Sequence, residues 1–159
     1  MRTLHINLSQ QLLSTVEDGT LLKGYSISSA LNGVGQQQGS GQTPIGHHYI
    51  RAKIGHGAKI NSVFIGRRAT GEIYTSHLAA KFPKRDWILS RILWLCGTEE
   101  GLNRLGLVDS MARYIYIHGT PDSEPMGVPK SHGCIRMRNA DMVEIFNWVP
   151  NSCPVYIEV

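Results

Sequence analysis

Ser131-His132-Gly133-Cys134-Ile135-Arg136-Met137 is the segment on which the interpretation of this sequence depends, together with Ile117-His118-Gly119-Thr120 upstream. The two segments supply one cysteine, two histidines, one arginine and two glycines. A glycine directly before a cysteine lets the backbone turn sharply and approach a ligand closely. A thiol becomes a useful nucleophile when a base and an anion-stabilising environment surround it. Together the segments therefore predict a cysteine-based site.

Cys134 is the candidate nucleophile. Free cysteines are most often buried and structural, which is how we interpret Cys96 in an apolar run and Cys153 in a Ser-Cys-Pro turn. Cys134 differs because Gly133 and Arg136 make its surroundings tight and electropositive. Such surroundings lower the pKa of a thiol. We therefore expect Cys134 to be reactive and the other two cysteines to be inert.

His118 is the candidate general base. Sixteen residues separate it from Cys134, which is enough for the chain to loop back and bring an imidazole to the thiol. A pair of this kind carries out acyl transfer. No Asp or Glu stands where it obviously orients the imidazole, so the carbonyl of Gly119 is the expected partner. His132 either shares a face with the thiol or shapes the turn, and Ser131 is expected to donate a hydrogen bond.

Metal binding is the competing chemistry. His118, His132 and Cys134 would make three zinc ligands. No Cys-x-x-Cys pair or second ligand cluster supports a zinc site, so we expect no metal and no cofactor. Three further histidines are too isolated to indicate a site and are expected at the surface: His47, His48 and His56.

Alternating polar and apolar residues predict short strands over much of the chain. Three strands are expected near the N-terminus, over residues 3–8, 10–15 and 21–28, with a hairpin turn at Glu17-Asp18-Gly19. Residues 86–96 are apolar on nearly every face, and periodicity does not decide between a buried strand and a helix. Further extended segments are expected at 48–54, 62–66, 113–118 and 154–159.

One helix is predicted near the C-terminus. Asn139 is a good N-cap residue, and Pro150 ends the pattern. Between them, apolar residues recur at helical spacing: Met142, Ile145, Phe146 and Val149. Residues 32–42, rich in glycine and glutamine, are expected to form a surface loop. Without a repeat or a linker, residues 1–159 are expected to form a single, mainly β domain.

The composition of the chain indicates which classes of partner and which cellular compartment to expect. The 159 residues carry a net charge of +4, but Lys and Arg are dispersed and no nucleic-acid motif accompanies them, so no nucleic-acid partner is expected. Three cysteines cannot all pair, which fits a reducing compartment. The N-terminus alternates like a strand rather than a signal peptide, and no apolar stretch reaches the roughly 18 residues that cross a membrane. We therefore expect a cytoplasmic protein, or a periplasmic one if the N-terminus has been trimmed.

The two segments quoted first resemble the signature of the L,D-transpeptidase catalytic domain, also called the YkuD type. Residues 6–12 resemble the opening hairpin of that family, and Thr43-Pro44-Ile45-Gly46 resembles its Thr-Pro-x-Gly element. The resemblance implies a β-sandwich with a short C-terminal helix. Residues 67–110 match the family less clearly and are expected to form a lid or one wall of a cleft.

The resemblance also implies the chemistry, which is acyl transfer on peptidoglycan stem tetrapeptides. Cys134 would attack the carbonyl of an L-centred residue, usually diaminopimelate. The terminal D-Ala would leave, and the resulting thioester would pass to water or to an amine of another stem. His118 would take the thiol proton and later pass one to the leaving amine.

Residues next to the cysteine receive roles from the same resemblance. Backbone N–H groups around His132, Gly133 and Cys134 would hold the oxyanion. Ser131 and Arg136 would contact the substrate, and Arg136 would hold a substrate carboxylate or the loop itself.

Two outcomes of this chemistry are open. The first is an L,D-carboxypeptidase that trims tetrapeptides or muropeptides during murein recycling, because a cytoplasmic enzyme meets soluble fragments and abundant water. The second is an L,D-transpeptidase that forms 3-3 cross-links in the cell wall. From other classes, a zinc hydrolase and a non-catalytic peptidoglycan-binding module remain as alternatives. The presence of both Cys134 and His118 favours an enzyme over a binding module.

Overall fold

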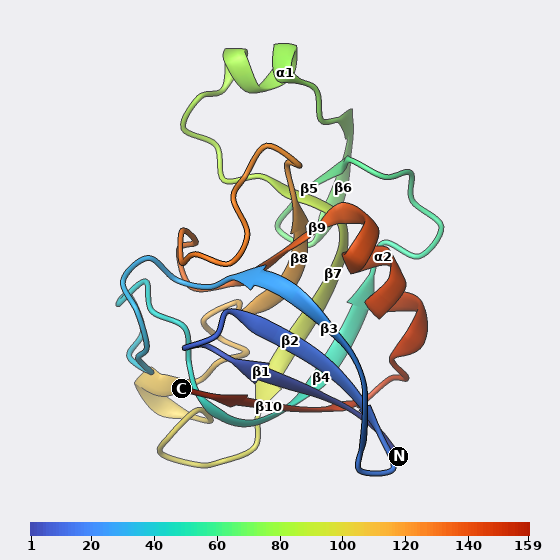
Figure 1. Cartoon of the computed structure of the whole chain (residues 1–159). Coiled ribbons are helices and arrows are strands. Elements are labelled where there is room, and N and C mark those ends of the chain that lie inside the picture. The colour runs from blue at the N-terminus through green and yellow to red at the C-terminus, as the bar shows by residue number, and fades with distance from the viewer.

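The chain folds mainly as β-strands, in a computed structural model that describes residues 1–159 (Figure 1). The strands are β1 (Arg2–Asn7), β2 (Leu12–Glu17), β3 (Thr20–Ser28), β4 (Gly46–Ile54), β5 (Ser62–Ile65), β6 (Arg68–Ile73), β7 (Ile88–Gly97), β8 (Tyr116–Thr120), β9 (Ile135–Arg138) and β10 (Pro154–Glu158). The helices are α1 (Ser76–Lys81) and α2 (Asn139–Trp148), with a 3-10 turn at Gly106–Val108. The prediction of a mainly β fold with a short C-terminal helix is confirmed.

All ten strands join one sheet that closes on itself. The order is β4-β10-β1-β2-β3-β9-β8-β7-β5-β6, and β4 also pairs with β7. Eight strands therefore form a ring, and β5 and β6 extend from β7 as a hairpin (Figure 1). Closing a sheet removes the unpaired edges that would otherwise attract other chains.

The N-terminal strands form as predicted, with ends shifted by one or two residues. β1 pairs antiparallel with β2, and β2 with β3. The β2–β3 turn places Asp18 and Gly19 at φ of 49° and 80°. Positive φ at both central residues is the geometry of a type I′ hairpin turn, in which an Asp-Gly pair is favoured.

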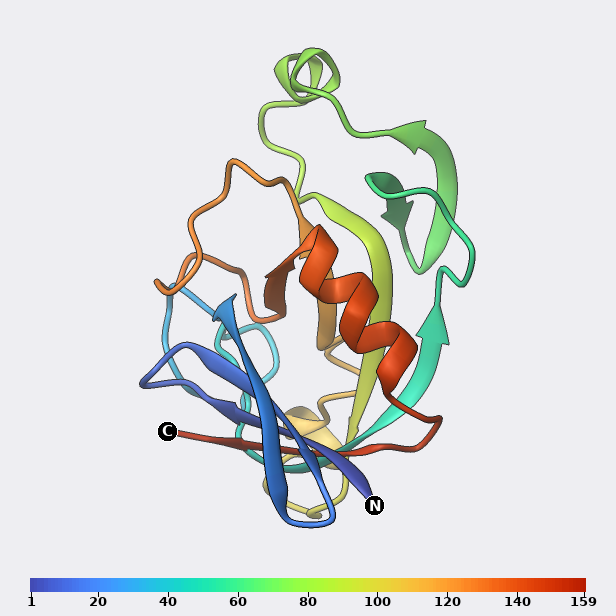
Figure 2. The ribbon, with the colours of Figure 1, turned by 45° about the vertical axis from the view of Figure 1, so that its right-hand side comes forward.

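β7 resolves the ambiguity of the apolar run at residues 86–96, which forms a strand. Its side chains are apolar on both faces because both faces are covered. Leu93 and Leu95 belong to the main core inside the ring, whereas Ile92 contacts Phe64 and Tyr116 in a smaller cluster on the other face. Helix α2 packs against β7 and β8 and contributes to the main core (Figure 2).

Asn139 differs from its prediction as an N-cap. It is the first residue of α2, Arg138 takes the cap position, and no side chain caps the helix. The Asn139 amide is buried instead, where it accepts from the Ser90 hydroxyl at 2.7 Å and donates to the Thr120 carbonyl at 2.9 Å. Tertiary hydrogen bonds therefore override the local preference of Asn for helix caps.

His48 corrects a second prediction, because it is buried rather than at the surface. Its side chain is 2% exposed, and its ring nitrogens lie 3.0 Å from the Gly46 carbonyl and 2.8 Å from the Ser110 hydroxyl. Burial lowers the pKa of His48 from 6.5 to about 4. The imidazole is therefore neutral in the folded protein at neutral pH.

Stability should consequently fall in mild acid. Below pH 6.5 the unfolded chain binds a proton at His48 that the folded chain rejects until about pH 4. The free energy of unfolding should drop by about 3 kcal/mol across this window and show no His48 dependence above it. Urea unfolding of the wild type and of His48→Gln from pH 4 to 8 measures this, and equal slopes for the two proteins would refute it.

The β5–β6 hairpin and α1 project beyond the ring (Figure 2). Thr75 caps α1 by accepting a hydrogen bond from the Leu78 N–H at 3.0 Å. None of the helices has the length and apolar character required to span a membrane.

Candidate active site

Parallel pairing of β8 with β9 brings the two predicted segments side by side. The register places Ile117 opposite Ile135 and His118 opposite Arg136. Both isoleucines face the main core. Since side chains alternate along a strand, His118 and Arg136 emerge on the opposite face of the sheet. Cys134 joins them there, because it packs against the outer apolar cluster.

His118 was predicted at a strand end but lies inside β8. The segment at 113–115 turns rather than extending, with φ of 56° at Tyr114, so β8 begins at Tyr116. The displacement embeds His118 in the sheet, where it is 1% exposed. A base held in a strand is more rigidly oriented than a base on a loop.

The Cys134 thiol lies against the backbone of the segment that leads into β8. Its sulfur accepts from the Tyr116 N–H at 3.3 Å and donates to the Tyr114 carbonyl at 3.3 Å. Burial raises the pKa of the Cys134 thiol to about 12, and the nearby charge of Asp86 acts in the same direction. The Tyr116 N–H and the charge of Arg136 oppose this shift without cancelling it. The lowered thiol pKa expected from the sequence is therefore wrong, since desolvation outweighs positive charge.

The His118 ring is fixed by its own neighbour. Nδ1 donates a hydrogen bond to the Gly119 carbonyl at 2.6 Å, which is the partner that the sequence suggested. A proton on Nδ1 leaves Nε2 as the basic nitrogen. Burial lowers the pKa of His118, although Asp86 and the Gly119 carbonyl favour the charged form. Thiol and imidazole are therefore both neutral at rest.

Glycine is required beside each of the two residues. A Cβ at Gly119 would collide with the side chain of Asn139 and the carbonyl of Leu89. Gly133 has φ of +135°, a conformation that side chains disfavour. The first glycine is therefore needed for close packing behind His118, and the second for the sharp turn before Cys134.

The turn before Cys134 is held by Ser131. The Ser131 hydroxyl donates to the Cys134 carbonyl and accepts from the Gly133 N–H at 3.2 Å. The Gly133 N–H is thus occupied, whereas no hydrogen bond within the chain uses the N–H of His132 or Cys134. The latter two are the N–H groups available to an oxyanion. Ser131 is 2% exposed, so its hydroxyl serves the turn, and its direct contact with substrate stays a prediction.

Thr43 supports the same turn from a distant part of the chain. Its hydroxyl donates to the Gly133 carbonyl at 2.9 Å and accepts from the Ala30 N–H at 3.0 Å, and the residue is fully buried. The sequence pointed to Thr43 only as part of a resemblance and gave it no role. The structure shows that it fixes the peptide group adjoining Cys134.

Thr43→Val should therefore destabilise the protein and loosen the turn. The substitution preserves shape but leaves the Ala30 N–H and the Gly133 carbonyl buried without a partner, which costs about 1–3 kcal/mol. Thr43→Ser keeps the hydroxyl and is the matched control. Urea unfolding measures the loss, and equal stability of the two variants would contradict this role.

Asp86 is a site residue that the sequence did not reveal. Its carboxylate accepts from Arg136 at 3.0 Å and lies 3.5 Å from Nδ1 of His132. Burial would raise the pKa of Asp86, but the charge that His118 gains in acid and the charge of Arg136 outweigh it and lower the pKa. His132 lies 46 residues after Asp86 in the sequence, so only tertiary folding brings the two side chains together. No local pattern could have indicated this contact.

Arg136 is committed largely to its own chain. The guanidinium is 9% exposed, bonds Asp86 and reaches the Lys130 carbonyl at 3.4 Å. Of the two roles expected for Arg136, these contacts belong to holding the loop. Its Nε is buried without a partner, and its contact with substrate stays a prediction.

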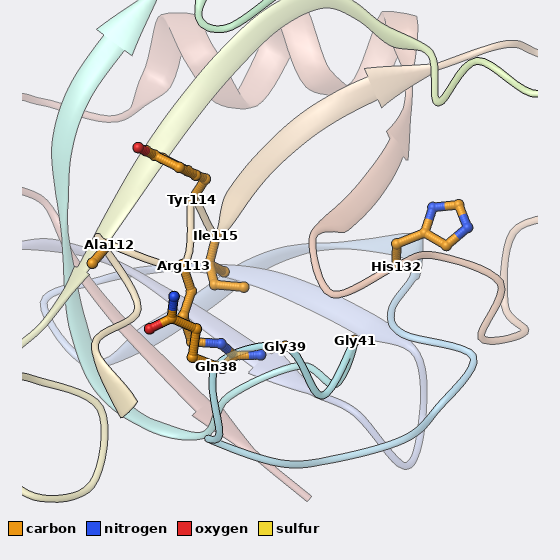
Figure 3. A pocket seen from close by; sticks show the side chains of 8 residues that line it. All are labelled: Gln38, Gly39, Gly41, Ala112, Arg113, Tyr114, Ile115 and His132. Atoms are coloured by element: carbon orange, nitrogen blue, oxygen red, sulfur yellow. The ribbon is translucent and has the colours of Figure 1, made fainter. Parts of the chain in front are cut away.

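His132 borders two pockets. One, of about 460 Å³, lies between the Gln38–Gly41 loop and residues 112–115 (Figure 3). The other, of about 390 Å³, includes Asp86 and Arg136 in its lining. The 67–110 segment, expected as a lid or a wall, thus contributes residues 83–87 to one wall. The glycine-rich loop predicted at 32–42 lines the pocket of about 460 Å³.

No cluster of His, Cys, Asp and Glu in the structure has the arrangement of a metal site. The competing zinc site would need His118, His132 and Cys134 to converge. His132 instead points toward Asp86, and its side chain is 75% exposed. The arrangement suits thiol chemistry, with a base, a nucleophile and two free N–H groups.

Known proteins match this chain in sequence and in fold. The sequence matches the L,D-transpeptidase catalytic domain family over residues 1–157. A search of curated proteins gives no match. An L,D-transpeptidase from Xylanimonas cellulosilytica superposes with a TM-score of 0.56 at 20% identity, covering 99% of this chain and 60% of that one.

Two further solved structures share the fold. L,D-transpeptidase 3 from Mycobacterium tuberculosis, with a faropenem-derived adduct, has a TM-score of 0.60 at 16% identity, covering 99% of this chain and 60% of that one. The catalytic domain of the Enterococcus faecium L,D-transpeptidase, acylated by ertapenem, has a TM-score of 0.58 at 18% identity. This match covers 99% of this chain and 96% of that one. The chain spans less than two thirds of the first two chains and nearly all of the isolated domain. This protein belongs to the L,D-transpeptidase catalytic domain family.

Proposed function

We propose that this protein catalyses cysteine-dependent acyl transfer on peptidoglycan stem tetrapeptides, cleaving the bond between the L-centre of diaminopimelate and the terminal D-Ala. The observation that carries the proposal is the placement of Cys134 and His118 on one face of the β8–β9 pair, with the imidazole oriented by Gly119. Membership of the L,D-transpeptidase family supports the substrate class.

The neutral resting state determines how the first step proceeds. Attack of the Cys134 sulfur on the carbonyl carbon forms the C–S bond, while the thiol proton passes to Nε2 of His118. The carbonyl oxygen becomes an oxyanion near the free N–H groups of His132 and Cys134. Each such donor contributes about 2.7–4 kcal/mol to transition-state stabilisation in comparable sites.

Collapse of this intermediate releases the D-amino acid. The C–N bond breaks, and the His118 imidazolium returns its proton to the leaving amine, so His118 is neutral again. The remaining thioester then accepts a nucleophile. His118 takes a proton from that nucleophile as it attacks, the C–S bond breaks, and the imidazolium returns the proton to the Cys134 sulfur, which restores the resting enzyme.

Water is the acceptor that we propose, which makes the protein an L,D-carboxypeptidase of murein recycling in the cytoplasm. All three cysteines are free, and unpaired cysteines fit a reducing compartment. There the available substrates are soluble muropeptides and the abundant acceptor is water. The alternative proposal, supported by the family, is L,D-transpeptidation with 3-3 cross-links.

Product analysis separates the two reactions. The protein is incubated with a disaccharide tetrapeptide, and the products are identified by mass. Tripeptide and free D-Ala are the expected products. Dimers joined between two diaminopimelates would show that the protein is a transpeptidase rather than a carboxypeptidase. Absence of any product would support a binding module.

Reaction with β-lactams tests the covalent step independently of the acceptor. The solved Enterococcus faecium domain is acylated by ertapenem. We expect a carbapenem to add its mass to this protein at Cys134. We also expect activity to persist in a chelator and to be lost when the thiol is alkylated. Activity lost in a chelator but kept after alkylation would favour a zinc hydrolase.

A further inference from the structure

Arg113 is a half-buried cation without an acidic partner. None of the ion pairs in the structure involves it. Its guanidinium is instead held by backbone and hydroxyl oxygens, with the shortest bond, 2.7 Å, to the Gln42 carbonyl. Weaker bonds reach the Gly35 carbonyl and the Ser40 hydroxyl. A charge that is fixed in place but not neutralised attracts an anion.

Part of the hydrogen-bonding capacity of Arg113 remains free. A guanidinium carries five N–H donors in a planar fork. Three hydrogen bonds within the chain account for some of them. The Nε–H and one N–H of Nη1 are left, and each can donate a charge-assisted hydrogen bond to an anion.

Arg113 lines the pocket of about 460 Å³ beside the candidate nucleophile. In Figure 3 it extends toward the loop that carries Gly39, while His132 lies across the pocket and points away. The next residue, Tyr114, supplies the carbonyl that bonds the Cys134 thiol. The charge of Arg113 also favours the ionised form of the Cys134 thiol, so it acts on the sulfur directly.

A second link connects the pocket to the turn before Cys134. The Gln42 carbonyl that accepts from Arg113 lies against Gly133, 3.4 Å from where a Cβ would stand. Ile115, another lining residue, is 3.6 Å from the same point. The pocket thus opens directly beside the turn that presents the N–H groups of His132 and Cys134.

The other pocket at His132 differs in charge. Its arginines are compensated, since Arg136 pairs with Asp86 and Arg85 pairs with Glu72. A group carrying only negative charge would meet Asp86 and Glu124 in that pocket. Its unpaired lysine, Lys84, is exposed and is not held in place by any hydrogen bond, unlike Arg113. An anion is therefore better accommodated on the Arg113 side.

We propose that Arg113 binds the α-carboxylate of the C-terminal D-residue that leaves when Cys134 attacks. The inference rests on the proposed function and adds a requirement to it. Cleavage should need a free C-terminus directly after the scissile bond, so the enzyme removes one terminal residue and does not cut within longer stems. Charge-assisted bonds to Arg113 hold that residue while its amine is released.

The test compares two tetrapeptides that differ only in ending as D-Ala or as D-alaninamide. Wild-type kcat/KM should be about 10- to 100-fold higher for the acid, the range expected of hydrogen bonds between charged groups. In Arg113→Gln this preference should disappear because only the acid becomes a poorer substrate. Arg113→Lys should retain part of it, and Arg68→Gln, which removes an exposed cation on β6, should retain all of it.

Because Arg113 also anchors the 35–42 loop, the ratio of the two substrates matters more than either rate. A displaced loop would lower both rates equally, and that result would overturn the proposal. So would a wild-type enzyme that cleaves acid and amide equally well, a measurement that needs no variant. Cleavage of both peptides without preference would leave the proposed function intact, whereas failure to cleave either would refute the proposed function and this inference together.

Discussion

Cys134→Ala is expected to abolish turnover, lowering kcat for a stem tetrapeptide by about 10⁴-fold or more. In the proposed mechanism the sulfur forms the bond that divides the reaction into two steps, and no neighbouring group replaces it. The Ser131 hydroxyl, the nearest alternative nucleophile, is occupied within the turn. The carbapenem adduct should be lost as well, which intact-protein mass measures directly.

A loss of folding must be separated from this loss of chemistry. Cys134 lies outside the main core, so its truncation should leave the unfolding midpoint in urea nearly unchanged. Cys96→Ala is the matched control, since Cys96 is a buried thiol that bonds its neighbour's carbonyl and has no role in the proposed reaction. Cys96→Ala should keep both activity and the adduct. Turnover by folded Cys134→Ala would exclude the covalent mechanism.

His118→Gln is expected to lower the rate of Cys134 acylation by about 10²–10⁴-fold, the contribution typical of a positioned base. The effect follows from the resting state of the site. Burial holds the Cys134 thiol protonated, so the sulfur depends on a base at the moment of attack. The rate of mass gain with a carbapenem measures this step without involving the acceptor.

The pH dependence of Cys134 acylation tests the role of His118 as base in a second way. Burial lowers the pKa of His118, so the neutral base persists into mild acid. Acylation should therefore be constant near neutrality and fall only below pH 6.5, as His118 takes up a proton. His118→Gln should lose this acid limb, whereas His56→Gln, at an exposed position, should keep it. An acid limb that persists in His118→Gln would assign the base to another residue.

Much of the β structure was predictable from local sequence. The first three strands, the Asp18-Gly19 turn and β10 all follow from alternation and turn chemistry, and these effects act between near neighbours. The misplaced features are those decided by distant contacts. Asn139 caps no helix because Ser90 and Thr120 engage its amide, and His48 is buried because Ser110 meets its ring.

The sequence by itself determined which residues are candidates for thiol chemistry. Gly119 and Gly133 are dictated by close approach and positive φ, and both flank residues of the right type for thiol catalysis. The partner of His118 was also within reach, because Gly119 is its neighbour along the chain. These features depend on residues adjacent in sequence, where geometry is fixed by the backbone.

Only the tertiary structure decided the electrostatics. Asp86 and Arg113 lie far from Cys134 in sequence, yet their charges act on its thiol. The sequence suggested a lowered thiol pKa from Arg136 alone, whereas the folded site is governed by burial. Desolvation is a property of everything that surrounds a group, and closing the ring of strands brings those surroundings together. For that reason the identity of the nucleophile could be inferred from the chain, but its protonation state could not.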